Sequence, residues 1–323
     1  MIKLLTPSPA LMVESGEKVM LVADLHLGME YELSKQGISI PYQWNRILDE
    51  LIVLLDEHRP DRLVLLGDVK HGVPATSFSE RREIPLFFNA LFEAVPFIDI
   101  TRGNHDANIQ KYLPDEVHLH TSKGVMFGDD FKVAAFHGHA WPNPAVMTAD
   151  AIIMAHNHPT VMLDTPLGVK ITRPAWVRGK PDIERLAAAF LNQDNVRLKE
   201  EEEPLSIFEE EYGFECGSPE IIVMPTFNDI LGGLPVNSEA PESLLGPLFR
   251  KKLVDMDTFD AYMLDGTFMG SIGFLRDRLE GRVWGNTQPP RYYQIQLLDD
   301  SRPIGTPLSP KGLPSPFNSQ HRQ

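Results

Sequence analysis

Residues 18–26 read KVMLVADLH, and this short stretch carries the pattern that decides the fold. A largely apolar run, residues 18–23, ends at an acidic side chain, Asp24. Apolar runs that stop at or just before polar residues return at residues 63–66 (LVLL), 97–101 (FIDIT), 133–136 (VAAF) and 151–155 (AIIMA). Continuous rather than alternating hydrophobicity is typical of strands that are buried on both faces, as in an α/β sandwich.

Helical patterns lie between the first of these runs. Residues 44–55 and 84–94 each place apolar side chains three and four positions apart, which predicts two helices with one buried face. Strand and helix in alternation predict an α/β fold. From residue 117 onward the runs are shorter and the turns contain glycine, so we expect the second sheet to be mostly antiparallel. Residues 220–224 (EIIVM) predict a further strand in it.

Composition bounds the class of protein. The 323 residues are 42% hydrophobic and 23% charged, which predicts one large domain with appendages or two domains. A net charge of -15 disfavours tight, non-specific nucleic-acid binding, although bound divalent cations reverse the local field. The single cysteine, Cys216, excludes a disulfide framework and a thiolate metal site. No apolar run approaches the roughly 18 to 20 residues of a membrane span, so we expect a cytoplasmic protein with no membrane association.

The ends of the predicted strands carry side chains that bind metal ions. Asp24 and His26 are two positions apart, and so are His156 and His158, which in an extended backbone places each pair on one side. Open α/β sheets hold their ligands beyond the carboxyl ends of strands. Each residue alone has an ordinary alternative as a cap, turn or surface residue. Their occurrence in order at successive strand ends predicts one metal cluster of Asp24, His26, Asp68, Asn104, His137, His156 and His158.

These motifs resemble those of the calcineurin-like metallophosphoesterases, whose pattern is D-x-H, G-D, G-N-H-D/E, a lone H, and G-H-x-H. The chain has them between residues 18 and 160, with Ala155 where the family usually has glycine. The resemblance implies a metal-dependent phosphoric ester hydrolase. It also implies a four-layer α/β/β/α sandwich of two mixed sheets flanked by helices.

The resemblance further implies how the ligands divide between two metal ions. The first ion takes Asp24, His26 and His158, the second takes Asn104, His137 and His156, and Asp68 bridges both. A carboxylate has two oxygens and spans cations about 3.5 to 4 Å apart. Imidazole, carboxylate and amide donors suit Mn²⁺, Fe, Co or Zn better than Mg²⁺, so we expect two divalent ions, with Mn²⁺ first.

A mechanism follows from such a cluster. Two cations that share a water lower its pKa and give hydroxide for in-line attack on phosphorus. We expect His105 to be the general acid, with Asp106 orienting or charging it. The alternative for His105 is a structural turn residue. His71, Arg102 and His139 are candidate substrate contacts, although exposed loop positions explain both histidines equally well.

A narrower resemblance covers residues 156–159, 173–176 (RPAW) and 220–233. These segments are similar to compact phosphoesterases found alongside bacterial DNA ligases and to their archaeal relatives, which are kin of the nuclease subunit of the double-strand-break repair complex. On this basis we expect a metallophosphoesterase domain at 1–236, interrupted by an acidic surface insertion at 180–218. A C-terminal extension at 237–300 is expected to hold an Asp-Gly hairpin at 262–269 and a strand at 291–297, and 301–323 is expected to be a flexible tail.

The leading hypothesis is hydrolysis of a phosphodiester in a nucleotide or a nucleic acid. One alternative is phosphomonoesterase or protein phosphatase activity, because fold does not choose among substrates. Another is a metal-binding scaffold without catalysis that serves a protein partner. The insertion and the extension are the candidate surfaces for such a partner or for a homo-oligomer.

Overall fold

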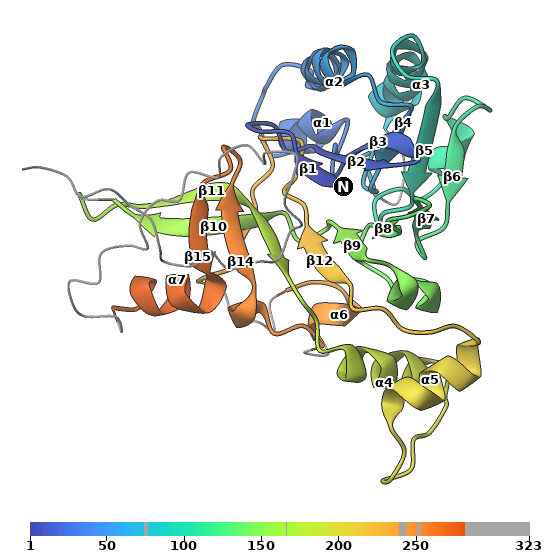
Figure 1. Ribbon diagram of the computed structural model, residues 1–323. Helices are drawn as coiled ribbons and strands as arrows, with labels where there is room; N and C mark the ends of the chain where they lie inside the picture. Colours follow the sequence, from blue (N-terminus) through green and yellow to red (C-terminus); the bar gives the residue numbers. More distant parts are fainter. Residues whose placement is uncertain (74–76, 166, 239–243, 251–252, 282–323) are drawn as a thin grey trace, which may run out of the picture.

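A computed structural model describes residues 1–73, 77–165, 167–238, 244–250 and 253–281. Two β-sheets lie at its centre, with helices on their outer sides (Figure 1). The first sheet has the order β1-β2-β3-β4-β5-β6. Its strands are β1 Ile2–Leu4, β2 Leu11–Ser15, β3 Glu17–Val22, β4 Arg62–Leu65, β5 Phe97–Thr101 and β6 His118–His120. The strands from β3 to β6 run parallel, so their carboxyl ends meet at one edge.

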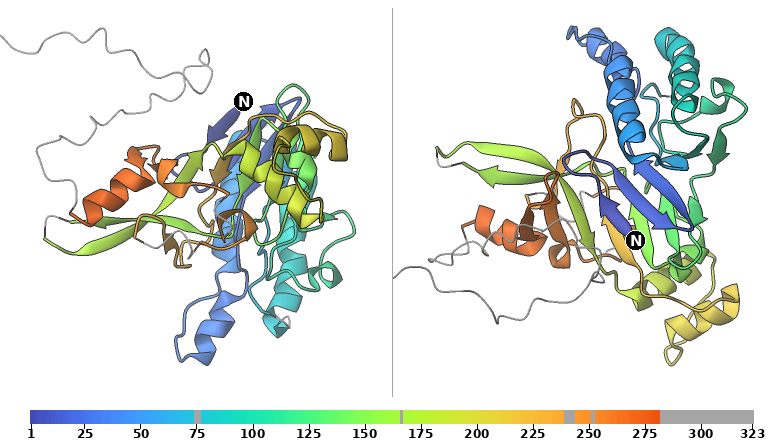
Figure 2. Two further views of the ribbon diagram at one scale, coloured as in Figure 1. Left: turned by 90° about the horizontal axis from the view of Figure 1, so that it is seen from below. Right: turned by 45° about the horizontal axis from the view of Figure 1, so that its top comes forward.

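The second sheet has nine strands, along the path β13-β10-β11-β12-β9-β8-β7, with β14 paired to β11 and β15 paired to β14. Five of its pairings are antiparallel and three parallel, as the shorter runs predicted. The β10–β11 hairpin extends beyond the rest of the sheet (Figure 2). The strands of the second sheet are β7 Val125–Phe127, β8 Val133–Phe136, β9 Ala151–Met154, β10 Pro159–Asp164, β11 Lys170–Gly179, β12 Glu220–Val223, β13 Leu234–Pro235, β14 Asp260–Met263 and β15 Phe268–Ser271.

Three hydrophobic clusters define four layers. One cluster joins the first sheet to α2 (Trp44–His58) and α3 (Phe78–Phe92), and a second lies between the sheets. The third joins the second sheet to α4 (Ile183–Gln193) and α5 (Pro204–Tyr212). Alternate residues of one strand enter different clusters: Met20 of β3 faces the helices and Leu21 faces the other sheet. The predicted α/β/β/α sandwich is confirmed.

The predicted helices exist, and one begins earlier than its apolar pattern. α3 starts at Phe78 because Ser77 and Glu80 form a capping box, in which each side chain binds the other's backbone N–H. The remaining helices are α1 Met29–Lys35, α6 Pro247–Arg250 and α7 Ile272–Leu279. Within the described part of the chain, no helix is both long and apolar enough to cross a bilayer.

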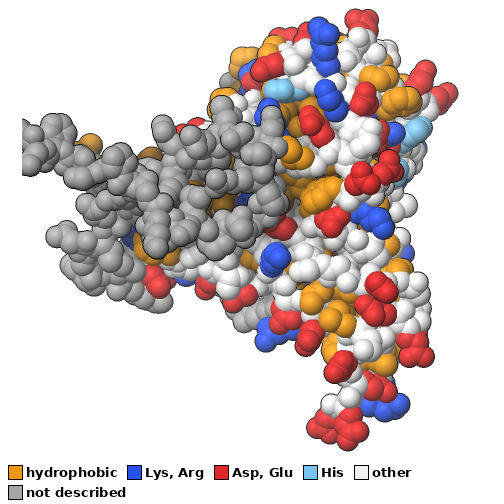
Figure 3. Space-filling model, in the orientation of Figure 1, with side chains coloured by type: hydrophobic (Ala, Val, Ile, Leu, Met, Phe, Trp, Pro, Cys, Tyr) orange, Lys and Arg blue, Asp and Glu red, His pale blue; other side chains and the backbone are white. Residues whose placement is uncertain are grey.

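The segment at 180–218, expected as a surface insertion, has a buried side. α4 places Leu186, Ala187, Phe190 and Leu191 in the cluster under the second sheet, so this helix is a covering layer and not only a surface feature. Acidic side chains gather at the far end of the α4–α5 projection, where the acidic run at 200–203 is largely exposed (Figure 3). The apolar side chains of α4 lie on one face of the helix, and this pattern in the sequence was the available signal for the packing.

The residues after 236, expected as an extension, continue the second sheet. The predicted hairpin is present as β14 and β15, and β14 pairs with β11 from Ala175 to Arg178. The expected strand at 291–297 and the tail at 301–323 lie outside the described residues.

Candidate metal centre

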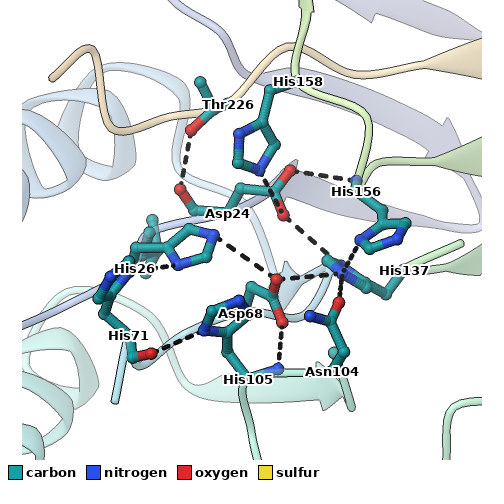
Figure 4. A network of polar contacts seen from close by, with 12 residues as sticks. Asp24, His26, Asp68, His71, Asn104, His105, His137, His156, His158 and Thr226 are labelled. Atoms are coloured by element: carbon teal, nitrogen blue, oxygen red, sulfur yellow. Dashed lines mark hydrogen bonds and ion pairs between the residues drawn. The ribbon is translucent and has the colours of Figure 1, made fainter. Parts of the chain in front are cut away.

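The predicted ligands lie where the carboxyl ends of both sheets meet (Figure 4). In the first sheet they follow β3, β4 and β5, and in the second they follow β8 and β9, which are also parallel. Hydrogen bonds join the two ends: His156 N donates to Asp24 Oδ2 at 3.3 Å, and His137 Nδ1 lies 2.8 Å from the Leu66 carbonyl oxygen. The sandwich therefore brings segments far apart in the sequence into one site.

The backbone at the site is unusual. Asp24, His26, Asp68, His156 and His158 all have positive φ, and they are five of the eight non-glycine residues that do among those described. Left-handed backbone is disfavoured for residues with a Cβ and collects at functional sites. The expectation that the i, i+2 pairs point to one side of an extended strand is wrong, because β3 ends at Val22 and β9 at Met154. Tight turns aim these side chains at the site.

The donor atoms of the predicted ligands form two adjacent groups. Asp24, His26 and His158 have donor atoms within 4.8 Å of one another, and so do Asp68, His137 and His156. Asn104 belongs beside the second group, since its Oδ1 lies 3.2 Å from His137 Nε2. The seven side chains that the sequence predicted as one cluster therefore lie together.

Asp68 lies between the two groups. Its Oδ2 is 3.5 Å from His26 Nε2 and 3.3 Å from His137 Nε2, while Oδ1 accepts a hydrogen bond from His105 N at 2.8 Å. Gly103 permits this placement, because a Cβ there would lie 2.1 Å from Asp68 Oδ1. The glycine of the Gly-Asn-His-Asp turn is thus required for close approach of the carboxylate.

Burial and charge hold both carboxylates, His26 and His156 in forms suited to a cation. Burial opposes protonation of His137 and His158, but pairing with the carboxylates outweighs it and raises the pKa of both, so a metal ion would have to displace a proton from each of these two rings. Burial opposes ionisation of Asp24 and Asp68, but neighbouring histidines, His137 among them, outweigh it and hold the pKa of each carboxyl below its ordinary range. Burial lowers the pKa of His137, yet the two carboxylates outweigh it and raise that pKa to about 9. Burial lowers the pKa of His26 to about 3 and, with the His137 charge, that of His156 to about 4. Ionised carboxylates and neutral imidazoles are the forms that bind metal.

The donor set fits divalent metal ions. Asp24 Oδ1 and His26 Nε2 are buried without a hydrogen bond of good geometry to a described residue. The ion-pair contacts that reach them are long, the shortest being from His158 Nε2 at 3.4 Å and from Asp68 Oδ2 at 3.5 Å respectively. Unpartnered buried polar atoms are costly, and a bound cation would satisfy both. Two carboxylates, imidazoles and one amide oxygen, without thiolate, are the ligands of a mixed nitrogen and oxygen site.

Three histidines form a row that starts within the first group: His26, His71 and His105, whose ring nitrogens also lie within 4.8 Å of one another. His26 Nδ1 lies 3.0 Å from His71 Nδ1, and the rings of His71 and His105 stack with centroids 5.3 Å apart. His105 Nδ1 lies 2.6 Å from the His71 carbonyl oxygen (Figure 4). A carbonyl only accepts hydrogen bonds, so Nδ1 carries the proton and Nε2 is the nitrogen left for exchange.

The predicted pairing of Asp106 with His105 is wrong. The Asp106 carboxylate is buried and accepts hydrogen bonds from Val69 N at 2.9 Å and Gly103 N at 2.8 Å. Burial and the Asp68 charge raise the pKa of Asp106 to about 6. Asp106 therefore links the Gly-Asp loop to the Gly-Asn-His turn, and the His71 carbonyl holds the His105 ring.

Two candidate substrate contacts have different surroundings. His139 lies near the second group, with ring centroids 5.2 Å from His137 and 6.0 Å from His156. Arg102 donates from Nη2 to Gln110 Oε1 at 3.0 Å, and no described residue of the cluster contacts its guanidinium.

Sequence reasoning missed the residues that support the site from behind. Thr226 Oγ1 donates to the Asp24 carbonyl at 2.9 Å, and Asn228 Nδ2 donates to the Leu25 carbonyl at 2.9 Å. Both residues follow β12 and lie in the segment 220–233, which resembles the ligase-associated phosphoesterases but for which the sequence predicted no role in the site. Polar residues directly after a buried strand were the available signal.

Comparison with known families agrees with this geometry. The family model described as "Calcineurin-like phosphoesterase" matches residues 17–212, more than half of the chain. The chain belongs to this family. Family membership makes it a metal-dependent phosphoric ester hydrolase, and divalent metal ions are its expected cofactor. Among proteins with curated functions, no sequence matches the chain.

Two solved structures are among those similar to this phosphoesterase. A nuclease named MPE from Pseudomonas putida is 16% identical, with a TM-score of 0.44, over 79% of this chain and 96% of its own. YfcE, a phosphoesterase from E. coli, is 19% identical, with a TM-score of 0.30, over 46% of this chain and 73% of its own.

Proposed function

We propose that this phosphoesterase hydrolyses phosphodiesters, in a nucleotide or a nucleic acid, with two divalent metal ions. The observation that carries the proposal is the pair of adjacent donor groups with Asp68 between them. A single metal ion does not require two such groups. Two ions about 3.5 to 4 Å apart and a carboxylate between them are the arrangement of two-metal phosphoesterases.

In this proposal the residues divide as the family resemblance implies. Asp24, His26 and His158 hold one ion, Asn104, His137 and His156 hold the other, and Asp68 contacts both. Bound ions supply an activated water and neutralise the phosphoryl oxygens. Imidazole and carboxylate donors favour Mn²⁺, with Fe, Co and Zn as other ions of suitable chemistry.

His105 is the proposed general acid. Its Nδ1 is committed to the His71 carbonyl, so the Nε2–H of the imidazolium is the proton available to a leaving alkoxide. The ring lies beside His26, with centroids 4.7 Å apart, and is partly exposed, so a substrate at the donor groups reaches it. Asp106 acts only as a positioning residue.

The diester preference rests on charge as well as on the resemblance to ligase-associated phosphoesterases. The chain carries a net charge of -15, and a phosphodiester brings one negative charge where a monoester brings up to two. Among small esters, long-range repulsion from an acidic protein disfavours the doubly charged monoester. Bound divalent cations reverse the local field at the site, so the argument does not extend to a nucleic-acid strand.

The test uses protein stripped with EDTA and refilled separately with Mn²⁺, Mg²⁺ or Zn²⁺. We expect Mn²⁺ to restore hydrolysis of bis(4-nitrophenyl) phosphate, with kcat/KM above that for 4-nitrophenyl phosphate. Asp68→Asn should reduce kcat/KM for the diester by about 100-fold or more, because the substitution weakens the contact to both ions. Asp49→Asn, at an exposed position, is the matched control.

The outcomes separate the competing functions. Absence of turnover with every ion contradicts the hydrolase proposal and supports the non-catalytic scaffold. A higher kcat/KM for the monoester supports the metal centre but contradicts the diester preference, and indicates phosphomonoesterase activity.

A further inference from the structure

A hollow opens next to the second donor group. Its volume is about 270 Å³, and it is lined by His139, Ala140, Trp141, His156, Gly246, Pro247 and Arg250. One wall follows β8 and contains His139 and Trp141, and the opposite wall is the segment at 244–250, which contains α6. Since His156 belongs to both the donor group and the hollow, a substrate at the metal centre has one side next to this space.

The wall at 244–250 is fixed to the metal centre by its backbone. Asn157, which lies between His156 and His158, accepts from Leu245 N at 2.7 Å and donates to the Leu245 carbonyl at 3.2 Å. Gly246 has φ of +88°, and a Cβ there would lie 2.1 Å from the Gly138 carbonyl oxygen. This segment is therefore part of the site, although it lies far beyond the predicted metal ligands in the sequence.

The hollow presents an aromatic ring and a cation. Trp141 is partly exposed and packs against Phe190 of α4, with ring centroids 5.3 Å apart, so the buried insertion helix supports it from behind. Arg250 is exposed, and within the described part of the chain its guanidinium forms no ion pair with a carboxylate.

We propose that this hollow binds the nucleoside next to the scissile phosphodiester, with its base against Trp141 and an adjacent phosphate near Arg250. The inference rests on the proposed phosphodiesterase function and narrows its substrate class to nucleic-acid strands and their oligonucleotides. The volume is below the roughly 300 to 1,000 Å³ of pockets that enclose a whole drug-sized ligand, so it suits one nucleoside with the rest of the strand outside. Aromatic stacking accepts any base, and a guanidinium pairs well with phosphate, so this subsite is not sequence-specific.

The experiment compares esters that share one leaving group. The Mn²⁺-loaded full chain is assayed with methyl 4-nitrophenyl phosphate, with thymidine 5′-(4-nitrophenyl phosphate), and with the latter carrying a 3′-phosphate. We expect kcat/KM for the thymidine ester to exceed that for the methyl ester by roughly 5- to 150-fold, the range that stacking of one base supplies. The 3′-phosphate should raise it further.

Two variants test the two contacts separately. Trp141→Leu should reduce the thymidine-to-methyl ratio at least threefold, and Trp141→Phe should retain most of it. Arg250→Gln should abolish the gain from the 3′-phosphate, while Arg197→Gln, at an exposed position after the end of α4, should leave that gain intact. Thermal melting of each variant reports whether it remains folded.

The results distinguish this inference from the function on which it depends. If wild-type protein hydrolyses the methyl ester but shows no preference for the thymidine ester, the proposed nucleoside subsite is contradicted and the proposed hydrolase function still stands. An unchanged thymidine-to-methyl ratio in Trp141→Leu, or an unchanged gain from the 3′-phosphate in Arg250→Gln, also overturns the subsite. If no ester is hydrolysed with any metal ion, the proposed function itself fails.

Discussion

Removal of the Asp106 carboxylate should destabilise the fold even without metal. Asp106→Ala leaves the buried N–H groups of Val69 and Gly103 without their acceptor. Each unsatisfied buried donor costs about 1–3 kcal/mol, so the two together cost about 2–6 kcal/mol, and the relief of a buried carboxylate with a raised pKa offsets part of this loss. The contact from Lys70 N, at 3.4 Å, is too long to add much.

Urea denaturation in EDTA at pH 8 measures this loss, because chelation removes any contribution from metal binding. Asp106→Asn keeps one acceptor oxygen but turns an NH₂ group toward the other donor, so about half of the loss is expected. Asp49→Asn, at an exposed position, serves as the control.

The same measurement distinguishes two roles of Asp106. A positioning residue between two loops affects stability in the metal-free protein. A metal-free free energy of unfolding within about 0.5 kcal/mol of wild type, combined with lost activity, would refute the positioning role and return Asp106 to the reaction itself.

Three further predictions concern other parts of the chain. His105→Asn should retain Mn²⁺ binding, measured by calorimetry, while kcat for a diester with an alkoxide leaving group falls about 100-fold or more; lost metal binding contradicts its role as an acid. Burial opposes ionisation of Asp99, but His120 and Arg62 outweigh burial and hold the pKa of this carboxyl below its ordinary value. The carboxylate therefore stabilises the fold above about pH 4, and this stabilisation is lost as the pH falls through the lower pKa of the folded state. Asp99→Asn should therefore cost about 1–3 kcal/mol at pH 7, and the difference from wild type in denaturant titrations should shrink below about pH 4; a constant difference argues against this pairing. Gly246→Ala should lower the free energy of unfolding by about 1–3 kcal/mol, because residue 246 has a positive φ and the added Cβ would meet the Gly138 carbonyl oxygen. Gly232→Ala is the control: no atom lies within 4 Å of its added Cβ, so thermal melting should show almost no change.

Local patterns in the sequence were sufficient for the elements and for membership of the metal cluster. Apolar runs that end at polar residues located β3, β4, β5, β8 and β9, because strands buried on both faces leave a continuous hydrophobic record. The predicted ligands lie together because parallel strands deliver their carboxyl ends to one edge. The family followed from the same motifs and is matched by the family model.

Contacts between distant segments were decided only by the tertiary structure. No periodicity indicates that Asp106 binds the backbone at Val69 and Gly103 and not the neighbouring His105, because hydrogen-bond partners depend on how two loops pack. The left-handed backbone of Asp24 and His26 was likewise invisible in a pattern that suits an extended strand. Arg250 reaches the hollow beside His156 because Asn157 and Leu245 bind each other across 88 positions of the chain, and such pairing leaves no mark in the local sequence of either residue.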